Sequence, residues 1–227
     1  MLSSTSASQV IWLVPLLPFI GFVVNGLFSL LPAWRGGTDG TTPASRRLTV
    51  SAVGVGVMVL AFTMSIWLAT QVAGTGNAVT SSLGEWIGAG SFHVDWALSV
   101  DQLSVLMMLV ITGVGSLIHI YSVGYMADDA GFARYFAYLN LFVGFMLMLV
   151  MGANLPVLFI GWEGVGLASY LLIGFWFGDT ANAAAGKKAF VVNRIGDFGL
   201  LLAMFIIFVN MGTLDFATIA RDHATLS

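Results

Sequence analysis

The stretch LPVLFIGWEGVGLASYLLIGFWF, residues 155–177, decides the fold class of this chain. It is apolar and long enough to cross a hydrocarbon core of about 30 Å, which takes roughly 20 helical residues. Its one charged residue, Glu163, lies well inside the run. A carboxylate at that depth costs several kcal/mol unless it is paired, hydrated or protonated, so ionisable residues inside spans usually have a function. The stretch therefore predicts a membrane helix that carries a functional group.

The composition of the whole chain agrees with a membrane protein. Its 227 residues are 58% hydrophobic and 8% charged, whereas a soluble domain has about 25% charged residues. So few charges cannot cover the surface of a water-soluble domain of this size. Five further apolar runs have the length of a span, at about residues 8–31, 48–72, 101–124, 134–151 and 185–211. We therefore expect an all-α polytopic membrane protein with about six transmembrane helices.

The composition also excludes several classes of function. The chain has no cysteine, so it holds no disulfide, no thiolate-bound iron–sulfur cluster and no cysteine-ligated zinc. Of its three histidines, only His119 falls in a long apolar run, which argues against a haem held by two histidines. The small net charge of −3 gives no electrostatic basis for nucleic-acid binding. We expect no cofactor or metal in this chain and no nucleic-acid partner.

Residues 83–100 depart from the helical pattern. From residue 92 to residue 100, apolar residues alternate with smaller or polar ones, a period of two that is typical of a strand. The preceding Gly-Ala-Gly-Ser, residues 88–91, favours a turn back onto residues 83–87. An open hairpin has unpaired edges and cannot lie in lipid. We therefore expect a small extramembrane β-hairpin between the second and third spans.

The positions of the lysines and arginines predict the orientation of the chain. One set of alternate loops carries most of them: Arg35, Arg46, Arg47, Arg134, Lys187 and Lys188. The opposite loops contain the hairpin and a polar tail, residues 212–227, with Arg221 as their one basic residue. Because cytoplasmic loops are enriched in Lys and Arg, we expect the N terminus, the hairpin and the tail on the outer, periplasmic side.

The sixth apolar run contains a second group of charges. Arg194 and Asp197 are three residues apart, so they share a helix face and can pair. Lys188 lies about two turns earlier, where it either joins this group or extends its ammonium to the lipid headgroups. We interpret the neighbouring Lys187 as an anchor at the membrane edge.

For each intramembrane residue a structural interpretation stands beside the functional one. A carboxyl group such as Glu163 can take and give a proton in a relay, or it can only hydrogen-bond a neighbouring helix. The Arg194–Asp197 pair either takes part in proton transfer or locks helix packing as a static ion pair. We interpret His119 mainly as a packing histidine, and Asp101 as the cap of the third span.

Two motifs resemble one known family. Residues 161–175, GWEGVGLASYLLIGF, resemble the fifth-helix motif of the large antiporter-like subunit of respiratory complex I, called L in bacteria and subunit 5 in mitochondria. Residues 188–197, KAFVVNRIGD, resemble its sixth-helix motif. Shorter matches occur at residues 101–104, 113–121, 134–142 and 212–216. The resemblance is continuous over residues 83–216 and weaker before them.

The resemblance implies a role in NADH:quinone oxidoreduction coupled to proton translocation. It implies a partial antiporter-like fold in the bacterial inner membrane, with other complex I membrane subunits and the lipid bilayer as partners. NADH, FMN, iron–sulfur clusters and quinone would be held by other subunits. The residues implied to carry protons are Glu163, Lys188, Arg194 and Asp197, with His119 as a weaker candidate. The alternatives are the large subunit of a multisubunit sodium/proton antiporter and a membrane-bound hydrogenase, which use a related module.

The chain departs from the family in length, because family members carry more than twice as many spans. We interpret residues 1–133 as an N-terminal membrane region with three spans and the hairpin. Residues 134–227 would begin a translocation module built from two inverted repeats. Of the first repeat, only spans four to six are present. The resemblance therefore implies the N-terminal part of a longer subunit, either as a fragment or as a truncated gene product.

Overall fold

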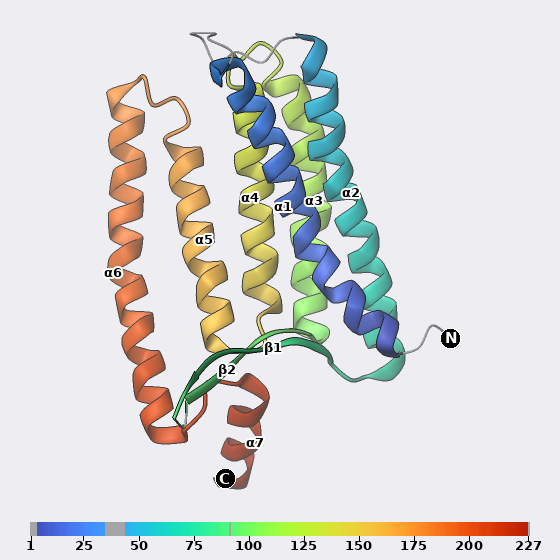
Figure 1. Cartoon of the computed structure of the whole chain (residues 1–227), viewed down its shortest axis with the longest axis vertical. Coiled ribbons are helices and arrows are strands. Elements are labelled where there is room, and N and C mark those ends of the chain that lie inside the picture. The colour runs from blue at the N-terminus through green and yellow to red at the C-terminus, as the bar shows by residue number, and fades with distance from the viewer. Residues whose placement is uncertain (1–3, 35–43, 91, 227) are drawn as a thin grey trace.

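A computed structural model describes residues 4–34, 44–90 and 92–226. Its long helices lie side by side, and a hairpin and a short last helix lie at one end of them (Figure 1). The elements are α1 (Ser4–Trp34), α2 (Ala44–Thr75), β1 (Val79–Ala89), β2 (Phe92–Val100), α3 (Gln102–Tyr125), α4 (Phe132–Met151), α5 (Leu155–Ile173), α6 (Thr180–Met211) and α7 (Phe216–Leu226).

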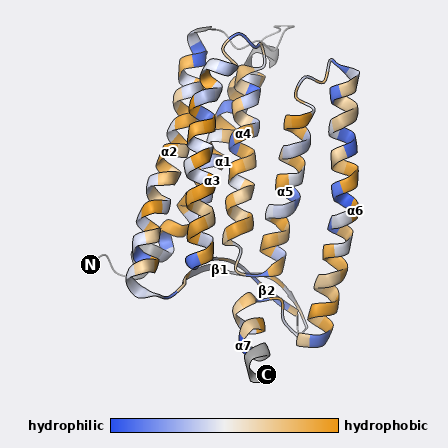
Figure 2. Cartoon of the chain, turned by 180° about the vertical axis from the view of Figure 1, so that it is seen from behind, coloured by the Kyte–Doolittle hydropathy of each residue, from blue (hydrophilic) through white to orange (hydrophobic). Residues whose placement is uncertain are grey.

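The six long helices confirm the prediction of a polytopic membrane protein. Each of α1 to α6 is long and apolar enough to cross a membrane. Hydrophobic residues continue along the whole length of these helices (Figure 2), and many large ones, such as Leu117 and Val209, are exposed. Exposed apolar surface of this extent is typical of helices that contact lipid or other membrane helices. The sixth helix begins before the expected residue 185, because the carboxylate of Asp179 accepts a hydrogen bond from Ala181 N and caps it.

The hairpin lies where the sequence predicts it. Strands β1 and β2 pair antiparallel from Val79↔Val100 to Ala89↔Phe92, so β1 starts earlier than the expected residue 83. Gly90 has a φ of +62°, which glycine adopts without steric cost and which permits the turn. Ser91 of the predicted turn lies outside the described residues. Figure 1 shows the hairpin across the ends of α3, α4 and α5, and its Phe92 ring lies 4.8 Å from the Phe208 ring near the end of α6.

The basic residues gather at the other end of the bundle. The start of α2, the α3–α4 turn and the α5–α6 turn lie together at that end (Figure 1). Arg46 and Arg47 lie in the first turn of α2, Arg134 lies in the first turn of α4, and Lys187 and Lys188 lie about two turns into α6. Arg35 lies outside the described residues. The assignment of this end to the cytoplasm follows from the charge distribution and stays a prediction.

A short connection between α4 and α5 ties three elements together; we call residues 152–155 the clasp. Asn154 caps α5 by accepting a hydrogen bond from Val157 N at 3.0 Å, and Pro156 lies in the first turn of α5, where its missing N–H costs little. Ala153 N donates to Ala97 O of β2 at 3.1 Å, and Ala153 O accepts from Phe216 N at 3.3 Å. The clasp therefore joins the hairpin to the segment that follows α6.

The segment interpreted as a polar tail contains a helix, α7. Asp215 caps it, because its carboxylate accepts hydrogen bonds from the backbone N–H of Thr218 at 2.9 Å and from the Thr218 hydroxyl at 2.8 Å. Residues 212–227 are polar and contain no apolar run, so their sequence does not predict this helix. The helix is too short and too polar to span a membrane.

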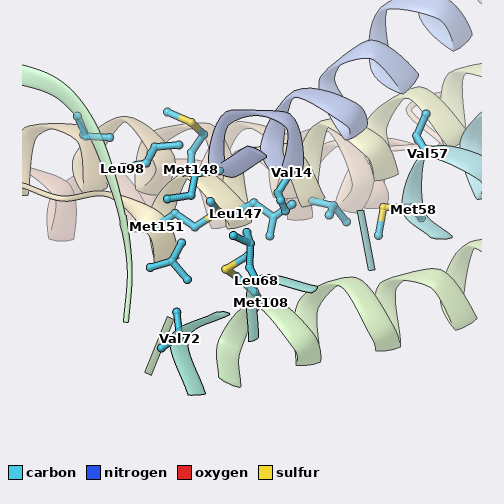
Figure 3. Packing of buried hydrophobic residues seen from close by; sticks show 14 residues of the cluster. Val14, Val57, Met58, Leu68, Val72, Leu98, Met108, Leu147, Met148 and Met151 are labelled. Atoms are coloured by element: carbon cyan, nitrogen blue, oxygen red, sulfur yellow. The ribbon is translucent and has the colours of Figure 1, made fainter. Parts of the chain in front are cut away.

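The core of the molecule lies within the α1–α4 bundle. Figure 3 shows the larger cluster, where Val14 of α1, Leu68 of α2, Met108 of α3 and Leu147 of α4 converge. A second cluster at the basic end includes Phe132, Phe136 and Phe175. Helix α5 packs on α4, whereas α6 packs mainly on α5 and buries few residues: Gly186, Asp197 and Met204.

Removal of the α3 cap should destabilise the protein. The carboxylate of Asp101 accepts a hydrogen bond from Ser104 N at 2.7 Å, as predicted, and this bond lowers the pKa of Asp101 below its usual 3.8. Asp101→Ala should therefore cost about 1 kcal/mol in thermal unfolding at neutral pH. The contribution of the carboxylate is present above pH 3.8 and is lost as the pH falls through the lowered pKa.

Asp101→Asn is the matched control, because asparagine caps as well as aspartate but does not titrate. It should unfold close to the original protein at pH 7 and lose the acid dependence of this site. An alanine variant that unfolds at the same temperature as the original protein at pH 7 would show that the cap contributes nothing.

Candidate functional site

Helices α5 and α6 bring three charged side chains together inside the membrane region. A salt bridge joins Glu163 Oε2 of α5 to Arg194 Nη1 of α6. The same Nη1 lies 3.6 Å from Asp197 Oδ2, one turn further along α6. The predicted pairing of Arg194 with Asp197 is therefore observed, and the structure adds Glu163 as a second partner. One guanidinium lies between two carboxylates from adjacent spans.

Two aromatic residues complete this group. The indole Nε1 of Trp162 donates a hydrogen bond of 2.6 Å to Asp197 Oδ1. The guanidinium carbon of Arg194 lies 4.6 Å from the ring centre of Phe190, within the range of a cation–π contact. Sequence reasoning missed Trp162 as a site residue. The available signal was an indole N–H inside a span, which needs a hydrogen-bond acceptor when water is absent.

The charge balance of the group is negative. The Asp197 side chain is 5% exposed and that of Glu163 is 25%, while Arg194 reaches further toward the surface with 42%. Two ionised carboxylates and one guanidinium leave one excess negative charge. In an apolar environment an unbalanced charge is costly. The group is therefore suited to take up one proton or one further cation.

A cavity of about 550 Å³ lies beside Asp197, between α4, α5 and α6. Its polar lining residues are Trp162, Ser169, Asn193 and Asp197, and apolar side chains line the rest. A water molecule occupies roughly 30 Å³ and needs polar partners, and this cavity offers both the room and the partners. The buried carboxylate of Asp197 therefore borders a space that can hold water.

The two lysines of α6 lie apart from this group. Lys187 and Lys188 are exposed, near the start of the helix. Among the described residues, the salt bridges that involve α6 join Arg194 to Glu163 and to Asp197, and neither lysine takes part in them. The structure thus does not bring Lys188 into contact with the other predicted site residues.

His119 is buried in a separate polar network. Its Nδ1 lies 2.7 Å from Gly115 O, and because a carbonyl only accepts, Nδ1 is the protonated nitrogen. Nε2 then accepts a hydrogen bond from Asn140 Nδ2 at 3.2 Å. Asn140 also donates to Gly54 O and accepts from Asn25 Nδ2, each at 3.3 Å. This network joins α1, α2, α3 and α4, which agrees with the packing interpretation of His119.

Neither asparagine of that network was predicted from the sequence. Asn25 and Asn140 are both fully buried, and each stands among apolar neighbours in its run. Such residues in a span usually hydrogen-bond across helices, but the sequence does not say with which partner. Among the described residues, no three histidine, aspartate or glutamate side chains gather closely enough to hold a metal ion.

Two family models match this chain. Residues 86–136 match the model described as NADH-Ubiquinone oxidoreductase (complex I), chain 5 N-terminus. Residues 152–226, which contain the whole charged group of α5 and α6, match the model described as NADH:quinone oxidoreductase/Mrp antiporter, TM. The first match ends within α4, and the second begins at the clasp.

Curated relatives give the same assignment. NADH-quinone oxidoreductase subunit L of Mycobacterium tuberculosis is 52% identical over 168 residues, which is 74% of this chain and 26% of the relative. The subunit of the same name from Escherichia coli is 43% identical over 202 residues, 88% of this chain and 31% of the relative. NAD(P)H-quinone oxidoreductase chain 5 of Synechocystis is 41% identical over 213 residues, 94% of this chain and 30% of the relative. The chain thus spans about a third or less of the length of these relatives.

A solved structure has the same fold. A chain of the membrane-bound sulfane sulfur reductase, an archaeal respiratory membrane complex, superposes with a TM-score of 0.74. The match covers 94% of this chain and 40% of that chain, with 21% sequence identity, so it supports the fold alone. With six spans, the two family models and relatives of 41–52% identity, the chain belongs to the family of antiporter-like L subunits (chain 5) of complex I, the NADH-quinone oxidoreductases.

Proposed function

We propose that this chain is part of a membrane-arm subunit of a proton-translocating NADH-quinone oxidoreductase. The observation that carries the proposal is the sharing of Arg194 by Glu163 and Asp197, inside two adjacent spans. Intramembrane carboxylates paired with a cation are typical of proton relays. No redox group is needed here, since NADH, FMN, iron–sulfur clusters and quinone belong to other subunits in this proposal.

In the proposed mechanism, Glu163 takes up a proton from water in the membrane region. Protonation removes one negative charge, and the guanidinium of Arg194 then pairs with Asp197 alone. Loss of the proton restores the bridge between the two carboxylates. Trp162 holds Asp197 in place through its 2.6 Å hydrogen bond, so that Arg194 has a fixed alternative partner. The exchange of Arg194 between two acids links proton uptake to a change of local charge.

The remaining assignments complete the proposal. Lys188 would relay charge from the membrane edge to the group around Arg194, and His119 is a weaker candidate for a proton-carrying role. Residues 1–133 would form the N-terminal membrane region, and residues 134–227 would begin the translocation module. The subunit would lie in the bacterial plasma membrane with its N terminus in the periplasm. Other membrane subunits of the complex would be its partners.

The alternative is the large subunit of a sodium/proton antiporter, or a membrane-bound hydrogenase. The model that matches residues 152–226 is named for both NADH:quinone oxidoreductases and Mrp antiporters, so this match alone does not separate them. The relatives cited above are named NADH-quinone or NAD(P)H-quinone oxidoreductase subunits, which favours the oxidoreductase.

Transport by the assembled complex tests this proposal. The complex with the full-length subunit is reconstituted into vesicles that contain a pH-sensitive dye, with NADH and a quinone supplied. Oxidation of NADH should acidify the lumen, and replacement of sodium by choline should leave the rate unchanged. Acidification that requires a sodium gradient and ignores NADH would contradict the oxidoreductase assignment and support the antiporter.

A further inference from the structure

A pocket at the basic end of the bundle lies apart from the charged group described above. It opens between the start of α4, the end of α5 and the start of α6, with a volume of about 190 Å³. That volume corresponds to roughly six waters at about 30 Å³ each. Its lining combines basic, hydroxyl-bearing and apolar residues: Arg134, Tyr138, Tyr170, Leu171, Phe177 and Lys187, among others.

The charge of this pocket is positive. Arg134 and Lys187 are its ionisable lining residues besides the two tyrosines, and no carboxylate lines it. The neighbouring hollow that shares Arg134 is different, because Asp129 and Asp179 line it. An anion is therefore favoured in the first pocket and disfavoured in the second. The tyrosine hydroxyls add hydrogen-bond donors for the oxygens of such an anion.

The guanidinium of Arg134 is fixed by neighbouring residues, and one of its N–H donors has no hydrogen-bond partner in the described structure. Its guanidinium carbon lies 4.5 Å from the ring centre of Phe175 and 4.9 Å from that of Phe177. Its Nη2 donates to Phe175 O at 3.2 Å. Its Nε is buried and has no hydrogen-bond partner in the described structure. A buried N–H without an acceptor is uncommon, so Arg134 has hydrogen-bonding capacity beyond the contacts it makes here.

The surroundings of the pocket identify the kind of anion. The pocket lies where α4 and α6 begin and α5 ends, and Phe177, which lines it, is 66% exposed. The ends of membrane-spanning helices lie near the lipid headgroups. We propose that the pocket binds the phosphodiester of an anionic phospholipid. Phosphate oxygens accept charge-assisted hydrogen bonds from guanidinium and ammonium groups, and basic pockets between membrane helices bind such headgroups. A zwitterionic headgroup would bring its own ammonium close to Lys187, which opposes binding.

Retention of lipid by the purified complex tests this site. The complex with the full-length subunit is exchanged into nanodiscs of phosphatidylethanolamine with or without phosphatidylglycerol, and the bound lipid is measured by native mass spectrometry. Lys187→Gln changes an exposed residue, so folding should be kept, and Arg134→Gln removes the central donor. Each should weaken retention of phosphatidylglycerol roughly tenfold, as expected for one lost charge-assisted hydrogen bond. Arg221→Gln, at the opposite end of the bundle, is the matched control and should retain the lipid.

Three results would overturn the proposal. The first is equal retention of phosphatidylglycerol by Lys187→Gln, Arg134→Gln and Arg221→Gln. The second is retention of phosphatidylethanolamine as strong as that of phosphatidylglycerol. The third comes from an arm with inorganic phosphate alone: if phosphate raises the melting temperature of the detergent-solubilised complex as much as the lipid does, the site binds a free anion. The proposal does not depend on proton translocation, and none of these measurements uses it.

Discussion

Glu163→Gln in the full-length subunit should abolish the proton translocation carried by this subunit while the complex still assembles. Glutamine keeps the size of the side chain and can still hydrogen-bond Arg194, but it cannot take or give a proton. Loss of a positioned acid–base group typically costs about 10²–10⁴-fold in rate. We therefore expect the protons pumped per NADH oxidised to fall, measured with a pH-sensitive dye in reconstituted vesicles alongside NADH consumption.

The chain contains its own matched control for this substitution. Glu85 is the other glutamate, exposed on β1 of the hairpin, and Glu85→Gln removes the same charge far from the group around Arg194. It should leave pumping unchanged. Glu163→Asp keeps a titratable carboxyl group and should restore part of the pumping. Full pumping by Glu163→Gln would refute the role proposed for Glu163, and loss of assembly in this variant would favour the purely structural interpretation.

Gly161→Ala should be among the most destabilising single-methyl additions in this chain. A Cβ at Gly161 would lie 2.4 Å from Leu149 N and 2.5 Å from Leu149 Cα of α4. These are backbone atoms, so the clash is relieved only if α4 and α5 move apart. We expect a loss of about 1–3 kcal/mol in stability, in the range of an overpacked core. The thermal unfolding temperature of the purified complex measures it.

Gly166→Ala, on the same helix, is the control, because a Cβ there meets no atom within 4 Å. It should be neutral or stabilising by roughly 0.5–1 kcal/mol, since alanine favours helix more than glycine does. Equal melting temperatures for the two variants would show that the α4–α5 approach at Gly161 is not needed. Because Glu163 lies two residues after Gly161, the displaced α5 should also lower proton pumping.

Local features of this protein could be predicted from the sequence because they depend on residues close together in the chain. The cap at Asp101, the start of α5 at Asn154 and the i,i+3 pair of Arg194 and Asp197 each need one helix only. The six spans and the hairpin follow from hydrophobic runs and period-two alternation in the same way. For these elements the sequence and elementary chemistry were sufficient.

Contacts between helices could not be predicted in this way. The bond from Trp162 to Asp197 and the salt bridge from Glu163 to Arg194 depend on the axial register of α5 against α6. That register depends on close packing of small residues, such as Gly186 against Gly174. The sequence alone does not say which small residues pack against each other. The same holds for Asn25 and Asn140, whose partners come from four different helices. A buried asparagine in a span indicates that a hydrogen-bond partner is present, but it does not identify the partner residue.

The clasp has a mechanical consequence for the charged group. Leu155 N donates to Leu214 O just beyond α6, so this end of α6 is held to the α4–α5 connection. At the same end, the Phe92 ring of the hairpin lies 4.8 Å from Phe208. If α6 tilts about this end, Arg194 lies about 26 Å from the pivot at 1.5 Å per residue. With that lever arm, a tilt of only about 5° moves the Arg194 backbone by about 2 Å, enough to separate its guanidinium from Glu163.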